Sequence, residues 1–136
     1  MLIIRKRAFL ILIVLTTLLS AANMTWAQEE TKPRLRLRNS ATAKGFIGGE
    51  AHESYVIRVR KGRTLTARIS WKLVDDNRAE FTVSDSPSFY NGGQLPFGKW
   101  SENGRRWSGK VPTTGDYYIY VVAHPTAHYQ LRVSVN

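Results

Sequence analysis

Three histidines, His52, His124 and His128, are the residues of this chain that most readily suggest metal chemistry. Two histidines four residues apart share one face on a helix, where they can hold zinc together. His124 and His128 instead flank a proline in a stretch that predicts a hairpin. We therefore expect no metal site and no cofactor, and we place His124 and His128 in a predicted partner-binding set.

Glycoside hydrolysis would need two carboxyl groups at a defined separation, one of them with a raised pKa. The candidate carboxylates lie in polar, loop-like stretches, where solvation keeps them ionised: Asp75, Asp76, Glu80, Asp85 and Glu102. Thr113 and Thr114 have no sign of a neighbouring base that would activate a nucleophile. The sequence contains no Ser-His-Asp elbow, glycine-rich phosphate loop or HExxH motif. We expect a protein that is not an enzyme.

Basic and aromatic side chains gather in residues 84–106, which read SDSPSFYNGGQLPFGKWSENGRR. A loop of this length in a compact domain is uncommon and often functional. Aromatic and arginine side chains are also the types that supply most binding energy at interfaces. The alternative is that its aromatics cover one end of the core. From this segment we predict five partner-binding residues: Tyr90, Lys99, Trp100, Arg105 and Arg106.

The N-terminus has the layout of a secretory signal peptide. Arg5, Lys6 and Arg7 precede an apolar run, and small residues at Thr25 and Ala27 fit a cleavage after Ala27. The run is short for a transmembrane helix, although an uncleaved anchor stays open as an alternative. We expect a signal peptide over 1–27, a polar leader over 28–34 and one domain over 35–136, with no transmembrane segment after cleavage. The predicted location is the periplasm or the exterior.

The net positive charge of the chain indicates which kinds of partner it suits. The chain carries 20 Lys and Arg against 10 Asp and Glu, and removal of three basic residues with the signal leaves 17 against 10, or +7. Such an excess suits a protein with a carboxylate-lined cleft, an acidic glycan or lipid headgroups. Export makes nucleic acid the least suitable partner, and plain solubility is the alternative explanation. The chain has no cysteine, so its stability must come from a packed core.

The remainder of the chain alternates apolar and polar residues with a period of two, which is typical of half-buried strands. The alternating runs are 34–38, 54–60, 65–71, 79–83, 117–122 and 129–135. KGR (61–63) predicts a hairpin between two of them, and NGG (91–93) and ENG (102–104) are further turns. We predict an all-β fold, a single antiparallel β-sandwich of six to eight strands with Greek-key or jelly-roll-like connections. A small barrel is the alternative.

The stretch VPTTGDYYIYV (111–121) predicts a corner of this sandwich. Tyr117 begins a late strand just after a turn and is expected to face inward. A tyrosine in this position can fix the corner through its hydroxyl group. We therefore interpret these residues as structural.

Two segments resemble a known family: GFIGGEAHESYVIRVRKGRTLTARI (45–69) and WSGKVPTTGDYYIYV (107–121). They are similar to the pre-peptidase C-terminal type of β-sandwich, and most similar to the periplasmic inhibitors of g-type lysozyme among small exported members. The resemblance covers most of residues 35–135 and specifies fold more strongly than partner. The inhibitors carry a long basic loop before their last strand, whereas AHPTAH (123–128) is short.

The resemblance implies an exported binding protein whose loops enter the glycan cleft of a lysozyme. In this hypothesis Lys99, Arg105 and Arg106 face the catalytic carboxylates, while Tyr90 and Trp100 occupy sugar subsites. The alternative is an accessory module that binds an anionic envelope glycan or lipid through arginine-lined strands.

Overall fold

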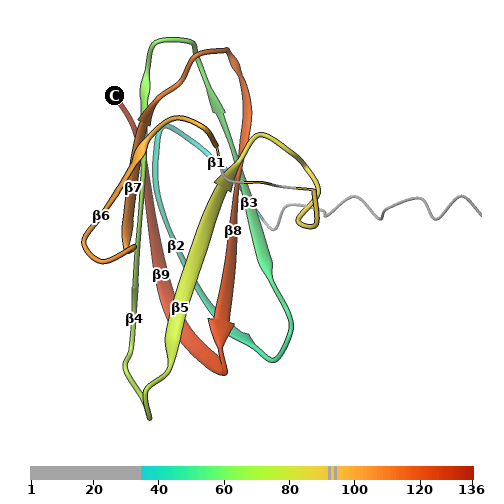
Figure 1. The fold of residues 1–136 in the computed structure, drawn as a ribbon, viewed down its shortest axis with the longest axis vertical. Coiled ribbons are helices and arrows are strands. Elements are labelled where there is room, and N and C mark those ends of the chain that lie inside the picture. Colours follow the sequence, from blue (N-terminus) through green and yellow to red (C-terminus); the bar gives the residue numbers. More distant parts are fainter. Residues whose placement is uncertain (1–34, 92, 94) are drawn as a thin grey trace, which may run out of the picture.

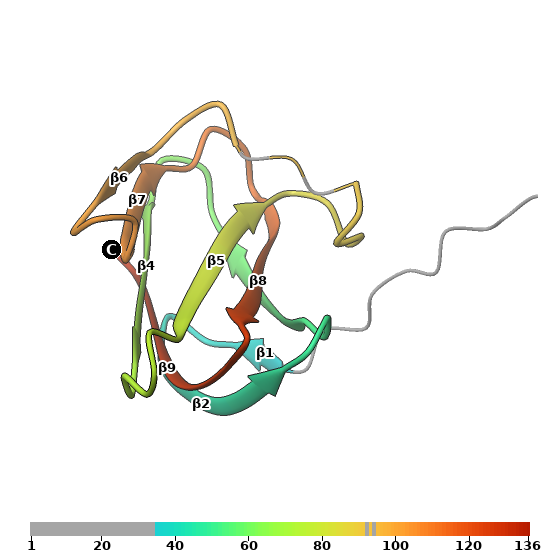
Figure 2. The same cartoon turned by 60° about the horizontal axis from the view of Figure 1, so that its bottom comes forward.

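The computed structural model describes residues 35–91, 93 and 95–136. The predicted signal peptide and polar leader lie outside this range. The described residues form nine strands in two sheets that face one another (Figures 1 and 2). In this part of the chain we find no helix of the length and apolar character that crossing a membrane requires.

The four-stranded sheet has the order β1-β3-β8-β5, with strands Leu35–Leu37, Glu53–Val59, Gly115–His124 and Arg78–Ser84. The five-stranded sheet has the order β2-β9-β4-β7-β6, with strands Ser40–Gly48, Thr126–Val135, Thr64–Trp71, Arg106–Lys110 and Lys99–Ser101. The predicted all-β sandwich is confirmed. It differs in two details, because there are nine described strands and β1 pairs with β3 in parallel.

Consecutive strands lie in opposite sheets at every described connection except the β6–β7 hairpin. The hairpin predicted at 61–63 is therefore wrong: β3 and β4 belong to different sheets, and the turn is a corner between layers. Gly62 does adopt the expected positive φ, at 85°. The hairpin predicted around Pro125 is wrong for the same reason, since β8 and β9 also lie in different sheets. A short turn reverses the chain equally well within a sheet and between two sheets.

The core consists of the inward-facing residues that the alternation predicts. Ile69, Ile119 and Leu131 are at most 1% exposed, and Trp107 is buried to the same extent. Burial of such side chains is the main stabilising contribution in a domain without disulfides.

The corner at Tyr117 is confirmed. Its hydroxyl donates to the backbone carbonyl of Thr113 at 2.8 Å, and its side chain is 3% exposed. The bond ties the start of β8 to the turn that follows β7. Residues 111–117 therefore serve the fold, as the sequence indicates.

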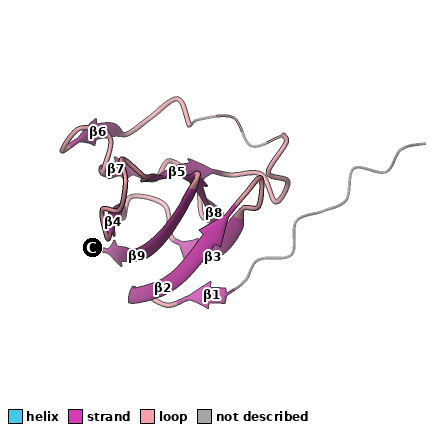
Figure 3. Cartoon of the chain, turned by 90° about the horizontal axis from the view of Figure 1, so that it is seen from below, coloured by secondary structure: helices cyan, strands magenta, loops and turns pink. Residues whose placement is uncertain are grey.

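The segment 84–106 divides into two parts with different positions. Beyond β5 the chain packs on the outer face of the four-stranded sheet, where the ring of Phe89 lies 5.5 Å from that of Tyr120. The chain then crosses to the other sheet and forms β6, an edge strand paired with β7 (Figure 3). Phe97 and Trp100 pack against the core. The segment is thus partly a cover for the core and partly an ordered hairpin.

Candidate functional site

The outer face of the five-stranded sheet carries a row of arginines. Strand alternation turns Arg68 of β4, Arg106 of β7 and Arg132 of β9 to solvent. The strand register pairs Arg68 with Arg132 on one side and with Arg106 on the other. Directly opposed residues on one sheet face have Cβ atoms about 5 Å apart. Three positive charges therefore lie side by side across β9, β4 and β7.

Two polar side chains contact two of these arginines. Glu102, from the turn between β6 and β7, forms an ion pair with Nε of Arg68 at 2.8 Å. With its amide oxygen turned toward Arg132, Gln130 accepts hydrogen bonds from Nε at 3.0 Å and from a terminal nitrogen at 3.2 Å. The side chains of Arg68 and Glu102 are 58% and 40% exposed, so solvent weakens their attraction.

The turn between β6 and β7 brings further residues to this face. Glu102 and Asn103 have φ values of 53° and 54°, and Gly104 follows at 79°. Three successive left-handed residues reverse the chain tightly, and the two that are not glycine are strained. The backbone amide of Ile69 donates to the carbonyl of Arg105 at 2.9 Å. The turn is thereby fixed against β4.

Arg105 stacks on Trp71. The guanidinium carbon lies 4.2 Å from the centre of the indole ring, within the range of a cation–π interaction. The indole nitrogen of Trp71 donates to the backbone carbonyl of Asn77 at 3.1 Å. Asn77 is buried, and its side chain bonds the backbone of Lys72, Val74 and Thr126. Trp71 is therefore a firmly held platform for Arg105.

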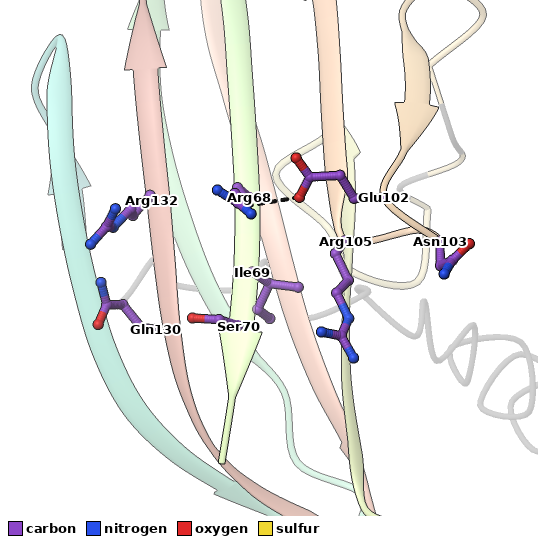
Figure 4. Close-up of a pocket in the computed structure, with 8 residues that line it drawn as sticks. All are labelled: Arg68, Ile69, Ser70, Glu102, Asn103, Arg105, Gln130 and Arg132. Carbon is purple, nitrogen blue, oxygen red and sulfur yellow. Dashed lines mark ion pairs between the residues drawn. The ribbon is translucent and has the colours of Figure 1, made fainter. Parts of the chain in front are cut away.

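Two hollows meet at Arg105. The first, called here the arginine cavity, has a volume of about 610 Å³ and is lined by Arg68, Ile69, Ser70, Glu102, Asn103, Arg105, Gln130 and Arg132 (Figure 4). The second, called the tryptophan groove, has a volume of about 850 Å³ and is lined by Trp71, Arg78, Ala79, Glu80, Phe81, Thr82, Trp100, Asn103, Gly104 and Arg105. Arg105 and Asn103 line both.

Three aromatic side chains line the tryptophan groove beside polar and charged ones. Trp100 of β6 lies over Phe81 of β5, with ring centres 4.9 Å apart. Trp71 lines the same groove from β4. The groove runs where the edges of the two sheets approach, between β5 and the β6–β7 hairpin. It is therefore a surface on which apolar or flat ligand groups can rest.

Five of the seven predicted partner-binding residues lie on the five-stranded sheet. Lys99, Arg105 and Arg106 are exposed on the β6–β7 hairpin, and Trp100 is half-buried in the tryptophan groove. His128 lies on the outward face of β9, with its ring 4.6 Å from that of Phe46. The structure thus gathers four predicted residues at one edge of the sheet and the fifth on the same face.

The other two predicted residues lie elsewhere. Tyr90 is 77% exposed, and its ring lies 6.4 Å from that of His52, beside the aromatic cover of the four-stranded sheet. His124 ends β8, with Nε2 at 3.7 Å from a carboxylate oxygen of Glu80. The three histidines therefore lie in three different surroundings. Within residues 35–136 as described, no three metal-binding side chains converge.

Arg68, Trp71, Gln130 and Arg132 are members of the site that sequence reasoning missed. Alternation does place Arg68 and Arg132 on outward faces, but it does not indicate that β4 and β9 are neighbours. Trp71 follows the inward-facing alternation of its strand, and only the fold shows that it lines a groove. The missing information is the pairing of strands far apart in sequence.

A second charged cluster lies on the four-stranded sheet. Arg36 donates to both carboxylate oxygens of Asp116, at 3.2 and 3.4 Å, and Arg58 lies 3.6 Å from the same carboxylate. Hydrogen bonding from Arg36 lowers the pKa of Asp116 below its ordinary value, with further help from the charges of both arginines. The same bond raises the pKa of Arg36. This cluster ties β1 to β8 and is structural.

These features define a class of protein: a two-sheet β-sandwich, with a basic face on one sheet and an aromatic groove at its edge. No protein-family model and no curated protein matches the sequence.

The likeness to particular proteins comes from solved structures. The chain is similar to Aeromonas hydrophila PliG, a periplasmic lysozyme inhibitor of g-type lysozyme, with a TM-score of 0.58 and 21% identity over 77% of this chain and 100% of that one. It is also similar to the pre-peptidase C-terminal domain of a collagenase from Bacillus anthracis, with a TM-score of 0.52 and 19% identity over 77% and 97% of the two chains. The resemblance predicted from sequence is confirmed, and what it establishes is the fold.

Proposed function

We propose that this chain is an exported, non-enzymatic binding protein that inhibits a lysozyme, and that the β6–β7 hairpin contacts the enzyme. Two observations support the proposal. The fold is similar to that of an inhibitor of g-type lysozyme. The hairpin stands at the edge of the sandwich (Figure 1). It carries Lys99 on β6, Arg105 in its turn and Arg106 on β7, and the turn is fixed to β4 by a backbone bond.

The proposed mechanism is steric and electrostatic. Lysozymes cleave glycans with a pair of carboxyl groups in a cleft. Guanidinium groups bind carboxylates through two parallel hydrogen bonds, and such charge-assisted bonds are among the strongest available to side chains. Arg105 and Arg106 would approach the acidic cleft from the hairpin, with Lys99 beside them. An occupied cleft excludes substrate, and no covalent step is required.

The preformed shape of the hairpin supports this role. Arg105 is held by its stack on Trp71 and by the backbone bond between its carbonyl and Ile69. A side chain that is already ordered loses less conformational entropy when it binds. This fixed basic turn is the single observation on which the proposed contact surface depends.

The seven predicted residues do not all belong to the proposed contact surface. Lys99, Trp100, Arg105 and Arg106 form the contact at the hairpin, and His128 extends it along the same sheet face. Tyr90 and His124 lie away from this surface, so they would contribute only if the partner also covers the four-stranded sheet or the β8–β9 end of the sandwich.

The test is inhibition of purified lysozymes of the c, g and i types, measured as the rate of cell-wall lysis against inhibitor concentration. We expect micromolar or stronger inhibition of the g type. Arg106→Ala should weaken it by roughly tenfold or more, as for loss of a charge-assisted contact. Arg60→Ala is the matched control, because it removes one exposed positive charge at the end of β3. The absence of inhibition of all three types would contradict the proposal.

A further inference from the structure

The arginine cavity carries an unbalanced positive charge. Arg68, Arg105 and Arg132 line it, and Glu102 is the one carboxylate among its lining residues. Glu102 pairs with Arg68, which leaves Arg105 and Arg132 without a carboxylate partner within the lining. Gln130, which faces Arg132, is neutral. The cavity therefore has a net charge of about +2, because three guanidinium groups face one carboxylate.

This arrangement has an electrostatic cost that the fold does not explain. Arg68 and Arg132 are opposed in the register of β4 and β9, and like charges directly opposite each other destabilise a sheet. Arg106 lies on the other side of Arg68, which adds to the repulsion. All three side chains are exposed, so the core does not require them. Of these three, Arg68 and Arg132 line the cavity, and an anion bound between them would convert their repulsion into attraction.

The chemistry of the lining indicates which anion fits. Guanidinium groups bind planar carboxylates and sulfate-like oxyanions with paired hydrogen bonds. Ser70 and Gln130 add a hydroxyl and an amide at the same wall (Figure 4). A carboxylate or sulfate group on a larger molecule is suited to this combination of charged and neutral donors.

The tryptophan groove indicates which kind of molecule carries the carboxylate or sulfate group. It adjoins the cavity at Arg105, which stacks on Trp71, and it is lined by both Trp71 and Trp100. Sugar rings have flat faces of C–H groups that rest on aromatic rings, while their hydroxyls take polar partners at the rim. A single ligand that spans both hollows therefore needs an anionic substituent next to a ring with an apolar face.

We propose that the arginine cavity and the tryptophan groove form one binding site for an acidic oligosaccharide. The carboxylate or sulfate group binds among Arg68, Arg105 and Arg132. The adjoining sugar ring lies in the groove against Trp71 and Trp100. Arg105 contacts both parts of the ligand, because it lines both hollows.

This site shares Arg105 and Trp100 with the surface proposed for lysozyme, but it takes a different kind of ligand. A hollow accepts a projecting group of a small ligand, whereas entry into an enzyme's cleft requires a projecting element such as the β6–β7 hairpin. Arg132 and Ser70 lie on the body of the sheet, outside that hairpin. Oligosaccharide binding can therefore be measured and refuted without any lysozyme present.

The experiment is calorimetric titration of the purified protein with four probes: a tetrasaccharide of galacturonate, a sulfated tetrasaccharide derived from heparin, neutral chitotetraose and inorganic sulfate. Galacturonate offers carboxylates alone, whereas the heparin fragment offers sulfates and carboxylates, so binding of the heparin fragment alone indicates sulfate as the anionic group. Chitotetraose tests the groove alone, and sulfate tests the cavity alone. Arg132→Ala and Trp71→Phe each alter one hollow, and Arg60→Ala controls for net charge.

We expect at least one acidic tetrasaccharide to bind more tightly than either chitotetraose or sulfate. Arg132→Ala should weaken that binding by roughly tenfold or more, whereas Arg60→Ala should change it by less than about twofold. Trp71→Phe should weaken it while the protein keeps its melting temperature within a few degrees. Failure of both acidic probes to bind, an equal loss in Arg132→Ala and Arg60→Ala, or sulfate binding as tightly as the tetrasaccharides would overturn the proposal.

Discussion

The guanidinium of Arg105 lies 4.2 Å above the ring of Trp71 and separates a basic cavity from an aromatic groove. Trp71 ends β4, whereas Arg105 comes from a turn that precedes β7. The stack therefore joins the end of β4 to the β6–β7 turn of the same sheet. Both proposals depend on this contact, because it fixes the hairpin and forms the wall between the two hollows.

Replacement of Arg105 should affect binding more than folding. A cation–π contact at an exposed site contributes about 0.5–1 kcal/mol, so Arg105→Ala should lower the free energy of unfolding by no more than this amount. Inhibition of g-type lysozyme should weaken by roughly tenfold or more. Arg105→Lys keeps the charge but loses the planar group, and we expect an intermediate effect. Urea unfolding and lysis assays measure the two quantities. A loss of stability that fully accounts for the loss of inhibition would contradict a binding role.

Removal of one hydroxyl group should weaken the corner at Tyr117. Tyr117→Phe loses the bond to the carbonyl of Thr113, and the expected cost is about 1 kcal/mol in the free energy of unfolding. Tyr90→Phe is a matched control, because Tyr90 is 77% exposed. Chemical denaturation of both variants gives the comparison. If Tyr117→Phe had the same free energy of unfolding as Tyr90→Phe, the hydroxyl of Tyr117 would not stabilise the corner.

Two glycines should respond differently to alanine. Gly98 and Gly104 have φ values of 89° and 79°, so a side chain costs about 1 kcal/mol or more in backbone strain at either position. A Cβ at Gly98 would also meet the ring of Trp107, whereas a Cβ at Gly104 meets nothing within 4 Å. Gly98→Ala should therefore lower the melting temperature more than Gly104→Ala does. The opposite order would show that Trp107 is not held tightly against the chain that leads into β6.

The ion cluster at Asp116 predicts a pH dependence of stability. Because Arg36 lowers the pKa of Asp116 in the folded state, the carboxylate stabilises the fold fully above its unfolded pKa of about 3.9. This contribution is lost as the pH falls through the lower folded pKa. Wild type should be more stable than Asp116→Asn from pH 5 to 8 by a constant difference, which decreases below about pH 4. Urea unfolding of both proteins at each pH measures this difference in the free energy of unfolding. A difference that grows on acidification would contradict this pairing.

Much of the fold was predictable because alternation is a local property. The six predicted runs correspond to β1, β3, β4, β5, β8 and β9. Strand β2, with the sequence SATAKGFIG, was missed because its small residues and glycines give a weak alternation. The three-residue strand β6 was hidden in a segment rich in turn-forming residues.

The site was predictable only in part. Its chemistry could be read from Lys99, Trp100, Arg105 and Arg106, since arginine and aromatic residues cluster in one short stretch. Its geometry could not, because Arg132 and Trp71 reach the site through pairing between distant strands. The same gap explains why the corner at 61–63 was interpreted as a hairpin.

Hydrogen exchange of the protein with and without g-type lysozyme tests the proposed contact most directly. We expect the enzyme to slow amide exchange in residues 99–107, which include the β6–β7 hairpin, and to leave residues 85–91 on the opposite sheet unchanged. Arg106→Ala should lose much of this protection at the same enzyme concentration. The proposed surface would be contradicted if amide exchange across the hairpin stayed unchanged under conditions in which the lysozyme is fully inhibited.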